Sequence, residues 1–381
     1  MWFEGDSHAL GTLAATTRCA AAALIFTVRN DPAWLEAAKL VIRNQAALGI
    51  LRTLEVRVVG HKSNDGHAAD LLAEVSSTQG LARLFVEVDW EVQWSVGAEP
   101  APLIPASIKE VTLENVDPRF VHRVLRSHAA TLQAVQLRGD CQGVAPLLAA
   151  IPGLRHLDCP VMEDLPLLAK CASLRSLKLT AEYPDEAAFQ AAAAFLRAAT
   201  HLEELELPWY YYSVPVEQGL LTALASSGRA ALRKLGLAYF TGLDVRLETE
   251  LASALPGLPA LEWLVLPRTV SRRVLAAINP GSAPRLRGLC IPDWSEAGCV
   301  HAVMHEADVS RVLASYSRFF LVVENFWCWE EQRCEHCTKG CHGVPWPTGE
   351  LEVGFYTHEA PDKEAVDALS WRSPCKVWIK A

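Results

Sequence analysis

The chain has 381 residues, of which 51% are hydrophobic and 21% are charged, and its 35 Lys and Arg against 44 Asp and Glu give a formal net charge of −9. This composition is typical of a globular protein and indicates neither disorder nor low complexity, apart from the Ala-rich run 191–194. The acidic balance argues against a broad phosphate-binding surface, so nucleic acid is not an expected partner.

The N-terminal segment resembles neither a secretory signal nor a membrane span. Glu4 and Asp6 stand where a signal needs positive charge, and the apolar stretch 19–28 is about half as long as a span. We interpret that stretch as a first, degenerate strand, with Leu24 lying 30 residues before Leu54. The 11 cysteines are too dilute for a disulfide scaffold. The sequence therefore predicts a cytoplasmic protein without a membrane partner.

A six-residue phrase, Leu-x-x-Leu-x-Leu or an apolar variant of it, recurs between residues 51 and 291. Its fourth and sixth positions alternate with polar neighbours, which is typical of a half-buried strand. Successive starts lie between 20 residues apart (154 to 174) and 30 residues apart (51 to 81). The starts are Leu51, Leu81, Ile108, Leu132, Leu154, Leu174, Leu202, Leu232, Leu261 and Leu286.

Between the phrases the apolar spacing changes to that of a helix. Asp185 can cap a helix whose apolar residues include Phe189 and Phe195. Parallel strands require a crossover connection, so strands that alternate with helices predict a parallel sheet. Further helices are predicted over residues 68–75, 121–125, 217–224, 247–255 and 271–278.

The phrase and its period resemble those of the leucine-rich repeat superfamily over roughly residues 20–293, with longer repeats similar to the ribonuclease-inhibitor type or to F-box proteins. The resemblance implies an α/β fold: a right-handed α/β horseshoe, or solenoid, over residues 1–293 with about 10–11 repeats, the first degenerate. One departure is that the usual Asn or Cys of the turn is missing from nearly every repeat, while prolines end four strands: Pro160, Pro208, Pro267 and Pro292.

On such a horseshoe, phrase positions 3, 5 and 7 point into the concave face, where a partner protein would bind. In the first four repeats these positions carry a mixed charged set: Thr53, Glu55, Arg57, Arg83, Glu87, Glu110, Glu114, Gln136 and Arg138. In the later repeats the predicted partner-binding residues are Glu204, Glu206, Trp209, Tyr211, Lys234, Tyr239, Trp263 and Trp294. The aromatic residues suit a binding hot spot at the rim. The alternative is that they fold back and cover the hydrophobic core.

Glu204 and Glu206 form a pair of acids on one face of a strand. They could share a proton, hold a cation or simply be solvated. No histidine or serine is placed beside them to complete a catalytic set, and we predict no catalytic residue. The chain is therefore predicted to be a non-enzymatic protein-interaction module or scaffold.

Residues 294–381 are predicted to form a separate small α+β cap with strands at 319–323, 351–355 and 377–379 and a helix at 363–369. Four cysteines lie between its first two strands: Cys328, Cys334, Cys337 and Cys341. Their spacing suits a structural zinc ion in tetrahedral coordination, while disulfides and free thiols are alternatives. No other cofactor is predicted.

Two other functions compete with the interaction module. One is a substrate-receptor subunit of a ubiquitin ligase, as F-box proteins with leucine-rich repeats are, although residues 1–50 lack the Leu-Pro opening of an F-box. The other is zinc-dependent or thiol chemistry in the C-terminal cap.

Overall fold

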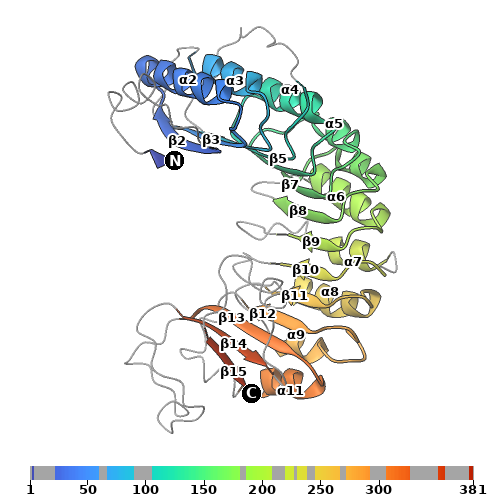
Figure 1. Ribbon diagram of the computed structural model, residues 1–381. Coiled ribbons are helices and arrows are strands. Elements are labelled where there is room, and N and C mark those ends of the chain that lie inside the picture. The colour runs from blue at the N-terminus through green and yellow to red at the C-terminus, as the bar shows by residue number, and fades with distance from the viewer. Residues whose placement is uncertain are drawn as a thin grey trace. The chain divides into compact units, whose positions relative to one another are not determined.

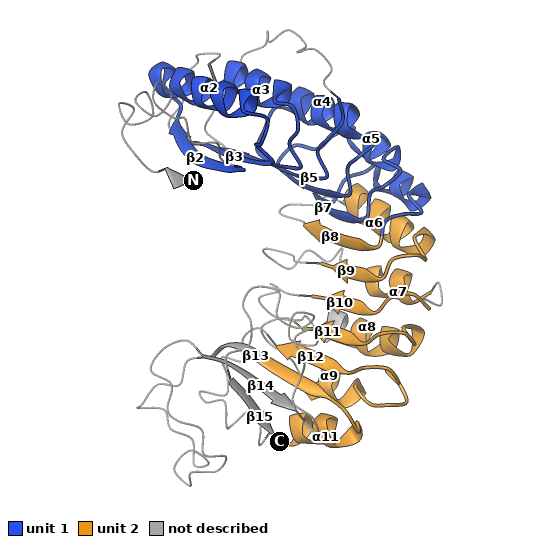
Figure 2. Ribbon diagram, viewed as in Figure 1, with its two compact units in different colours: residues 1–174 blue, residues 175–381 orange. Residues whose placement is uncertain are grey.

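The structure is a computed structural model, and it describes residues 2–3, 22–59, 67–89, 105–180, 186–207, 219–226, 230–237, 245–266, 272–291, 306–326, 351–356 and 377–380. The chain divides into two compact units, residues 1–174 (unit 1) and 175–381 (unit 2), as Figure 2 shows. The predicted boundary between residues 293 and 294 stays a prediction.

Unit 1 contains a parallel sheet whose strands pair in chain order. The predicted degenerate strand is confirmed, because Leu24 lies opposite Leu54 in the register of the second and third strands. The strands are β1 (Trp2–Phe3), β2 (Ala23–Arg29), β3 (Thr53–Val59), β4 (Arg83–Val88), β5 (Glu110–Glu114), β6 (Ala134–Arg138) and β7 (His156–Pro160).

The helices of unit 1 lie on one face of this sheet (Figure 1). They are α2 (Pro32–Ala47), α3 (His67–Ser77), α4 (Pro118–His128), α5 (Ala145–Ala149) and the 3₁₀ helix η1 (Leu165–Lys170). Asp31 and Asp117 accept hydrogen bonds from backbone N–H groups at the starts of α2 and α4, and a proline follows each of them. Such a cap followed by proline begins a helix at a defined residue. The helices predicted over residues 68–75 and 121–125 are confirmed as α3 and α4, with longer bounds, whereas α2 and α5 were not predicted.

Unit 2 begins with six strands that pair in parallel and in chain order, followed by two strands with mixed directions. They are β8 (Ser176–Thr180), β9 (Glu204–Glu206), β10 (Lys234–Gly236), β11 (Trp263–Val265), β12 (Gly288–Ile291), β13 (Phe320–Phe326), β14 (Leu351–Tyr356) and β15 (Val377–Lys380). β14 runs antiparallel to β13, and β15 runs parallel to β14. The three strands predicted for the cap are thus present. The parallel ladder continues into the first of them.

The helices of unit 2 are α6 (Glu186–Ala198), α7 (Leu220–Ala225), α8 (Val245–Ala254), the 3₁₀ helix η3 (Leu255–Gly257), α9 (Arg272–Ala277) and α11 (Ala307–Ser315). Helices predicted after Asp185 and over 247–255 and 271–278 are confirmed, and the one over 217–224 begins at Leu220. α11 follows Glu306 and was not predicted. The predicted helix over 363–369 lies outside the described residues.

The first position of the phrase forms the core of both units. All ten starting residues, Leu51 through Leu286, are at most 2% exposed. Burying one leucine side chain stabilises the fold by about 1.5–3 kcal/mol. At the second position of the phrase, the backbone carbonyl accepts two hydrogen bonds from the next strand. The backbone carbonyl of Arg52 accepts from the backbone N–H groups of Ala82 and Arg83 at 2.7 and 3.0 Å. In unit 2 the backbone carbonyl of Glu203 accepts in the same way from the backbone N–H groups of Arg233 and Lys234. The phrase is therefore a structural repeat.

Candidate functional site

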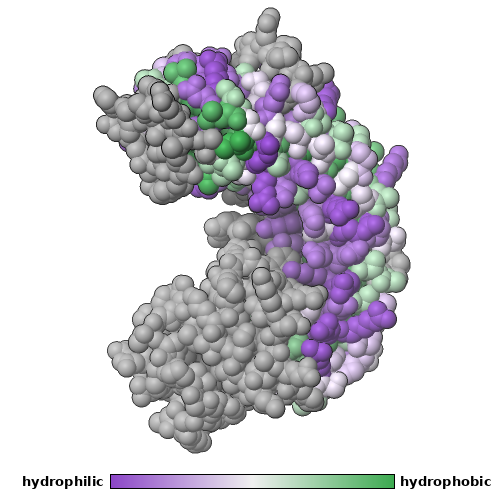
Figure 3. All heavy atoms as spheres, viewed as in Figure 1, coloured by the Kyte–Doolittle hydropathy of each residue, from purple (hydrophilic) through white to green (hydrophobic). Residues whose placement is uncertain are grey.

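The face of each sheet that lies opposite the helices is called here the helix-free face. Alternate strand residues point to it, because successive side chains leave a strand on opposite sides. In unit 1 these residues are half-buried or exposed, whereas their neighbours are buried. The face comprises Thr53, Glu55 and Arg57 of β3, Arg83, Phe85 and Glu87 of β4, Glu110, Thr112 and Glu114 of β5, Gln136 and Arg138 of β6, and His156 and Asp158 of β7. Hydrophilic residues gather over β5–β7 in Figure 3.

Arg57 joins two strands of this face. Its guanidinium lies 2.8 Å (Nη2–Oε1) from Glu55 and 3.5 Å (Nε–Oε2) from Glu87 on the neighbouring strand. The same group lies 5.2 Å from the ring centre of Phe85. A guanidinium at this distance from a ring makes a favourable cation–π contact. Arg57 therefore orients two acids and covers part of an aromatic ring that is itself partly exposed.

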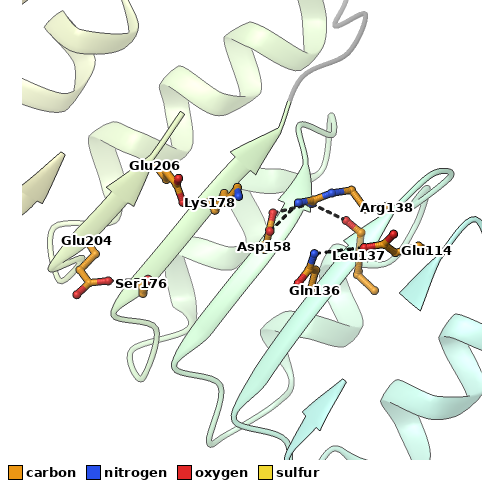
Figure 4. A network of polar contacts seen from close by, with 9 residues as sticks. All are labelled: Glu114, Gln136, Leu137, Arg138, Asp158, Ser176, Lys178, Glu204 and Glu206. Carbon is orange, nitrogen blue, oxygen red and sulfur yellow. Dashed lines mark hydrogen bonds and ion pairs between the residues drawn. The ribbon is translucent and has the colours of Figure 1, made fainter. Parts of the chain in front are cut away.

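Arg138 and Asp158 form the most closely joined ion pair of the face (Figure 4). Nη1 and Nη2 of Arg138 donate to the two carboxylate oxygens of Asp158 at 2.6 and 2.7 Å, and Nη1 also donates to the carbonyl of Leu137 at 3.1 Å. The side chain of Arg138 is 25% exposed and that of Asp158 is 17% exposed. A bidentate ion pair of this kind holds both side chains in one orientation.

Glu114 is the acid whose surroundings least favour its charge. Partial burial raises the pKa of its carboxyl, and the carboxylate of Glu87 raises this pKa further, while Arg138 opposes the shift. Glu87 and Glu114 lie opposite each other on β4 and β5, and like charges in that position repel. Gln136 donates to Glu114 at 3.4 Å. The two acids could hold a cationic group from a partner.

In unit 2 the strands β8–β10 carry a second polar cluster on the helix-free face. The expectation that no serine lies beside the acid pair was wrong, because Ser176 on the neighbouring strand donates its Oγ–H to Glu204 at 3.0 Å. Lys178 Nζ lies 3.8 Å from Glu206, and Figure 4 shows the orientations of these side chains. Lys234 lies opposite Glu204 in the register of β9 and β10. Burial lowers the pKa of Lys234, and the carboxylates of Glu204 and Glu206 counteract that shift. The predicted residues Glu204, Glu206 and Lys234 therefore share one face.

Farther along unit 2 the helix-free face is buried. Trp263 is 7% exposed, and the residues of β11–β13 on its side of the sheet are as inaccessible: Val265, Gly288, Cys290, Phe320 and Val322. The guanidinium of Arg287 lies 5.4 Å from the ring centre of Trp263. Trp263 was predicted to contact a partner, and in this structure its ring is mostly packed against the protein itself.

The other predicted site residues lie outside the described residues. These are the aromatic residues Trp209, Tyr211, Tyr239 and Trp294 and the cysteines Cys328, Cys334, Cys337 and Cys341. A zinc site, disulfides or free thiols in the C-terminal segment thus stay predictions. Within the described ranges, no three His, Cys, Asp or Glu side chains are grouped so as to hold a metal ion. None of the helices in these ranges has both the length and the apolar character that crossing a membrane requires.

Four residues of the two polar clusters were missed by reasoning from the sequence: Phe85, Asp158, Ser176 and Lys178. Each occupies position 3 or 5 of its phrase, so the rule that predicted the other residues of the face also points to these four. What the sequence did not reveal is which of them pair. That depends on side-chain reach between strands.

Comparisons with known proteins give little further information. No protein-family model and no curated protein matches the sequence. Among solved structures, the chain is similar to one titled "Crystal structure of TLR13-ssRNA13 complex", with 17% identity and a TM-score of 0.28 over 71% of this chain and 45% of that chain. The chain thus spans less than half the length of that protein. A TM-score of 0.28 does not establish a shared fold, so the repeat architecture rests on the strand register and buried leucines described above.

Proposed function

We propose that this protein is a non-enzymatic interaction module that binds a partner protein on the helix-free face of unit 1. The observation that carries this proposal is the set of charged side chains on this face, which are already held in place by one another. Arg57 and Arg138 are each fixed by ion pairs with neighbouring strands. A surface oriented in advance loses little conformational entropy when a partner docks, and this favours binding.

The chemistry of the face fits recognition better than catalysis. Arg57 and Arg138 engage Glu55, Glu87 and Asp158, so these carboxylates are held as ion-pair acceptors. The partly exposed ring of Phe85 offers the apolar contact that interface hot spots commonly use. The polar cluster of Glu204, Glu206 and Lys234 in unit 2 is a second candidate contact for a partner, together with the predicted aromatic rim.

The test compares two arginines that differ in location but are otherwise matched. The side chain of Arg57 is 48% exposed on the helix-free face, and that of Arg43 is 56% exposed on α2, and each pairs with a glutamate. Proteins captured from a native lysate are quantified for the wild type, Arg57→Glu and Arg43→Glu. We expect a protein whose capture decreases about tenfold with Arg57→Glu and not with Arg43→Glu, corresponding to ~1.4 kcal/mol.

Titration with the purified partner then confirms that binding is direct. The proposal is wrong if every captured protein responds equally to the two substitutions, provided that circular dichroism shows both variants folded. It is also wrong if the purified partner binds wild type and Arg57→Glu with the same affinity.

A further inference from the structure

One edge of unit 1 carries exposed positive charge without acids. This entry edge comprises the five connections that lead from a helix or loop into strands β3–β7, residues 48–52, 78–82, 105–109, 129–133 and 150–155. None of these connections contains an Asp or a Glu, although acids outnumber bases in the whole chain. Arg52, Lys109 and Arg155 of this edge are exposed. A local positive surface on an acidic protein can select an acidic partner.

The three cations occupy the same position of the phrase on alternate strands. The backbone hydrogen bonds show this alignment: Lys109 O accepts from Gln133 and Ala134, and Gln133 O accepts from Arg155 and His156. Neighbouring strands lie about 4.8 Å apart, so Cα atoms at this position on alternate strands lie about 10 Å apart. Arg52, Lys109 and Arg155 therefore form a line at regular intervals across the edge.

Within the part of unit 1 that the structure describes, no acidic side chain pairs with these three cations. Arg52 donates Nη1 to the carbonyls of Leu51 and Gly80, at 3.2 Å in each case, and both acceptors are uncharged. Among the described residues, neither Lys109 nor Arg155 has an ion-pair partner for its side chain. The nearby Arg83 is different, since its Nε lies 2.8 Å from Glu110.

In unit 2 the same phrase position is neutralised by its own neighbours. Arg175 Nε lies 3.1 Å from Glu203, and Arg233 joins Glu262 through two hydrogen bonds of 3.1 and 2.8 Å. The ends of α2, α4 and α5 lie at the entry edge of unit 1, and helix C-termini favour cations. That preference accounts for Arg52 and Arg155, which follow α2 and α5. Position 2 of the phrase carries no acid in unit 1, so the ladder of ion pairs in unit 2 has no counterpart at that position.

The entry edge also exposes apolar surface. Leu48 and Ile50, directly after α2, are 44% and 41% exposed and precede Arg52 in the same connection. A ligand for this edge would therefore combine carboxylates with an apolar side chain.

We propose that the entry edge of unit 1 binds an acidic amphipathic α-helix of a partner protein. Seven residues of an α-helix rise about 10.5 Å, which matches the spacing of the cations on alternate strands. Carboxylates at positions i, i+7 and i+14 would face Arg52, Lys109 and Arg155, and a leucine beside the first would cover Leu48 and Ile50. This surface is distinct from the helix-free face, so the proposal goes beyond the function proposed above and can fail independently of it.

The test measures binding of synthetic fluorescent helices to the full chain by anisotropy. One peptide carries three glutamates at i, i+7 and i+14, and a second of the same composition carries them at i, i+5 and i+10, which places them on different sides of the helix. We expect the first to bind at least about tenfold more tightly and to weaken when salt rises from about 50 to about 500 mM. Lys109→Glu and Arg155→Glu should each weaken it at least about fivefold.

Arg119→Glu is the matched control, because Arg119 is an exposed arginine at the start of α4 and the substitution changes net charge equally. It should leave binding unchanged. Equal affinities for the two peptides, equal losses with Arg119→Glu, or no binding at the lower salt concentration would each overturn the proposal. A single-stranded oligonucleotide provides a further arm, and tighter binding of it, with the same dependence on Lys109, would overturn the choice of an acidic helix.

Discussion

The helix-free faces of the two units differ although the same phrase builds their strands. In unit 1 this face is half-buried and charged, with Arg57, Arg138 and their acids paired above the sheet. In unit 2, from β11 to β13, the face is buried and apolar, as at Trp263 and Cys290. Strands buried on both faces are expected to be apolar throughout, whereas strands with one solvated face alternate. The residues at positions 3 and 5 of the phrase therefore decide whether the helix-free face of a repeat is solvated or forms a second hydrophobic core.

The largest expected difference concerns the two aromatic residues on these faces. Trp263→Ala should lower the free energy of unfolding of unit 2 by about 3–5 kcal/mol, because it leaves a cavity in a packed layer. Phe85→Ala should lower the free energy of unfolding of unit 1 by less, about 1–2 kcal/mol, since the ring is only partly buried and its removal leaves no closed cavity. Urea unfolding combined with hydrogen exchange of β4 and β11 measures the two effects separately.

If Phe85→Ala lowers the free energy of unfolding as much as Trp263→Ala does, the two helix-free faces do not differ in burial as described. Leu235→Ala and Leu113→Ala are controls, because both leucines are fully buried on the helix side and should cost about 2–5 kcal/mol in either unit.

A second difference is in pH dependence. In unit 1 the buried His128 accepts through Nδ1 from the N–H groups of Ser107 and Ile108, at 3.2 and 3.5 Å, and burial lowers its pKa from the ordinary 6.5. As pH falls through 6.5, the unfolded chain therefore takes up this proton before the folded chain does. Unit 1 should lose stability on acidification. His128→Ala should cost about 1–3 kcal/mol at neutral pH and make the acid dependence shallower.

In unit 2 a buried titratable side chain also bonds the backbone, but as a hydrogen-bond donor. The hydroxyl of Tyr316 donates to the carbonyl of Ala283 at 3.1 Å, and burial raises the pKa of Tyr316 from 10 to about 12. The folded chain keeps this proton longer than the unfolded chain, so the stability it contributes is lost as pH rises through that range. Tyr316→Phe should leave the acid limb unchanged. Unfolding curves between pH 5 and 8 in which His128→Ala parallels the wild type would contradict this account.

The architecture was more predictable from the sequence than the site. The phrase predicts the buried leucines and the strand order because a period of two and a crossover helix leave few alternatives. Even the pairing of the degenerate first strand, with Leu24 opposite Leu54, followed from the spacing of the two residues. The burial of Trp263 did not, since the phrase position states which way a side chain points and not whether other residues cover it. The pairing of Arg138 with Asp158 also depends on the reach of two side chains across strands, which periodicity does not encode.

The ion pairs of unit 1 offer a smaller test, which compares a protected pair with an exposed one. Asp158→Ala removes the acceptor of a bidentate pair and should destabilise unit 1 by about 1–2 kcal/mol, because the partly buried Arg138 loses two charge-assisted hydrogen bonds. Glu110→Ala breaks the pair with Arg83, whose side chain is 64% exposed, and should cost about 0–1 kcal/mol. Thermal unfolding of the two variants at low and high salt measures both costs. Similar costs would show that the sheet face does not shield Arg138.

The smallest expected effect is a gain in stability when Glu114 is replaced. Because burial and Glu87 raise the pKa of Glu114 above its ordinary 4.5, the folded chain binds this proton more readily than the unfolded chain. The stability that the protonated form contributes is therefore lost as pH rises from 4.5 through the raised value. Glu114→Gln should stabilise unit 1 at neutral pH by less than about 1 kcal/mol, since it removes the repulsion from Glu87, and this advantage should disappear in acid.

Glu110→Gln is the matched control on the same strand, where the acid pairs with Arg83. It should be neutral or slightly destabilising at pH 7, because it weakens an ion pair. Melting temperatures measured between pH 4 and 8 distinguish the two. If Glu114→Gln destabilises at pH 7 as Glu110→Gln does, then Arg57 and Arg138 outweigh the repulsion between Glu87 and Glu114. The charged face of unit 1 would then be neutralised by its own pairs, as the ladder of Arg175, Glu203, Arg233 and Glu262 is in unit 2.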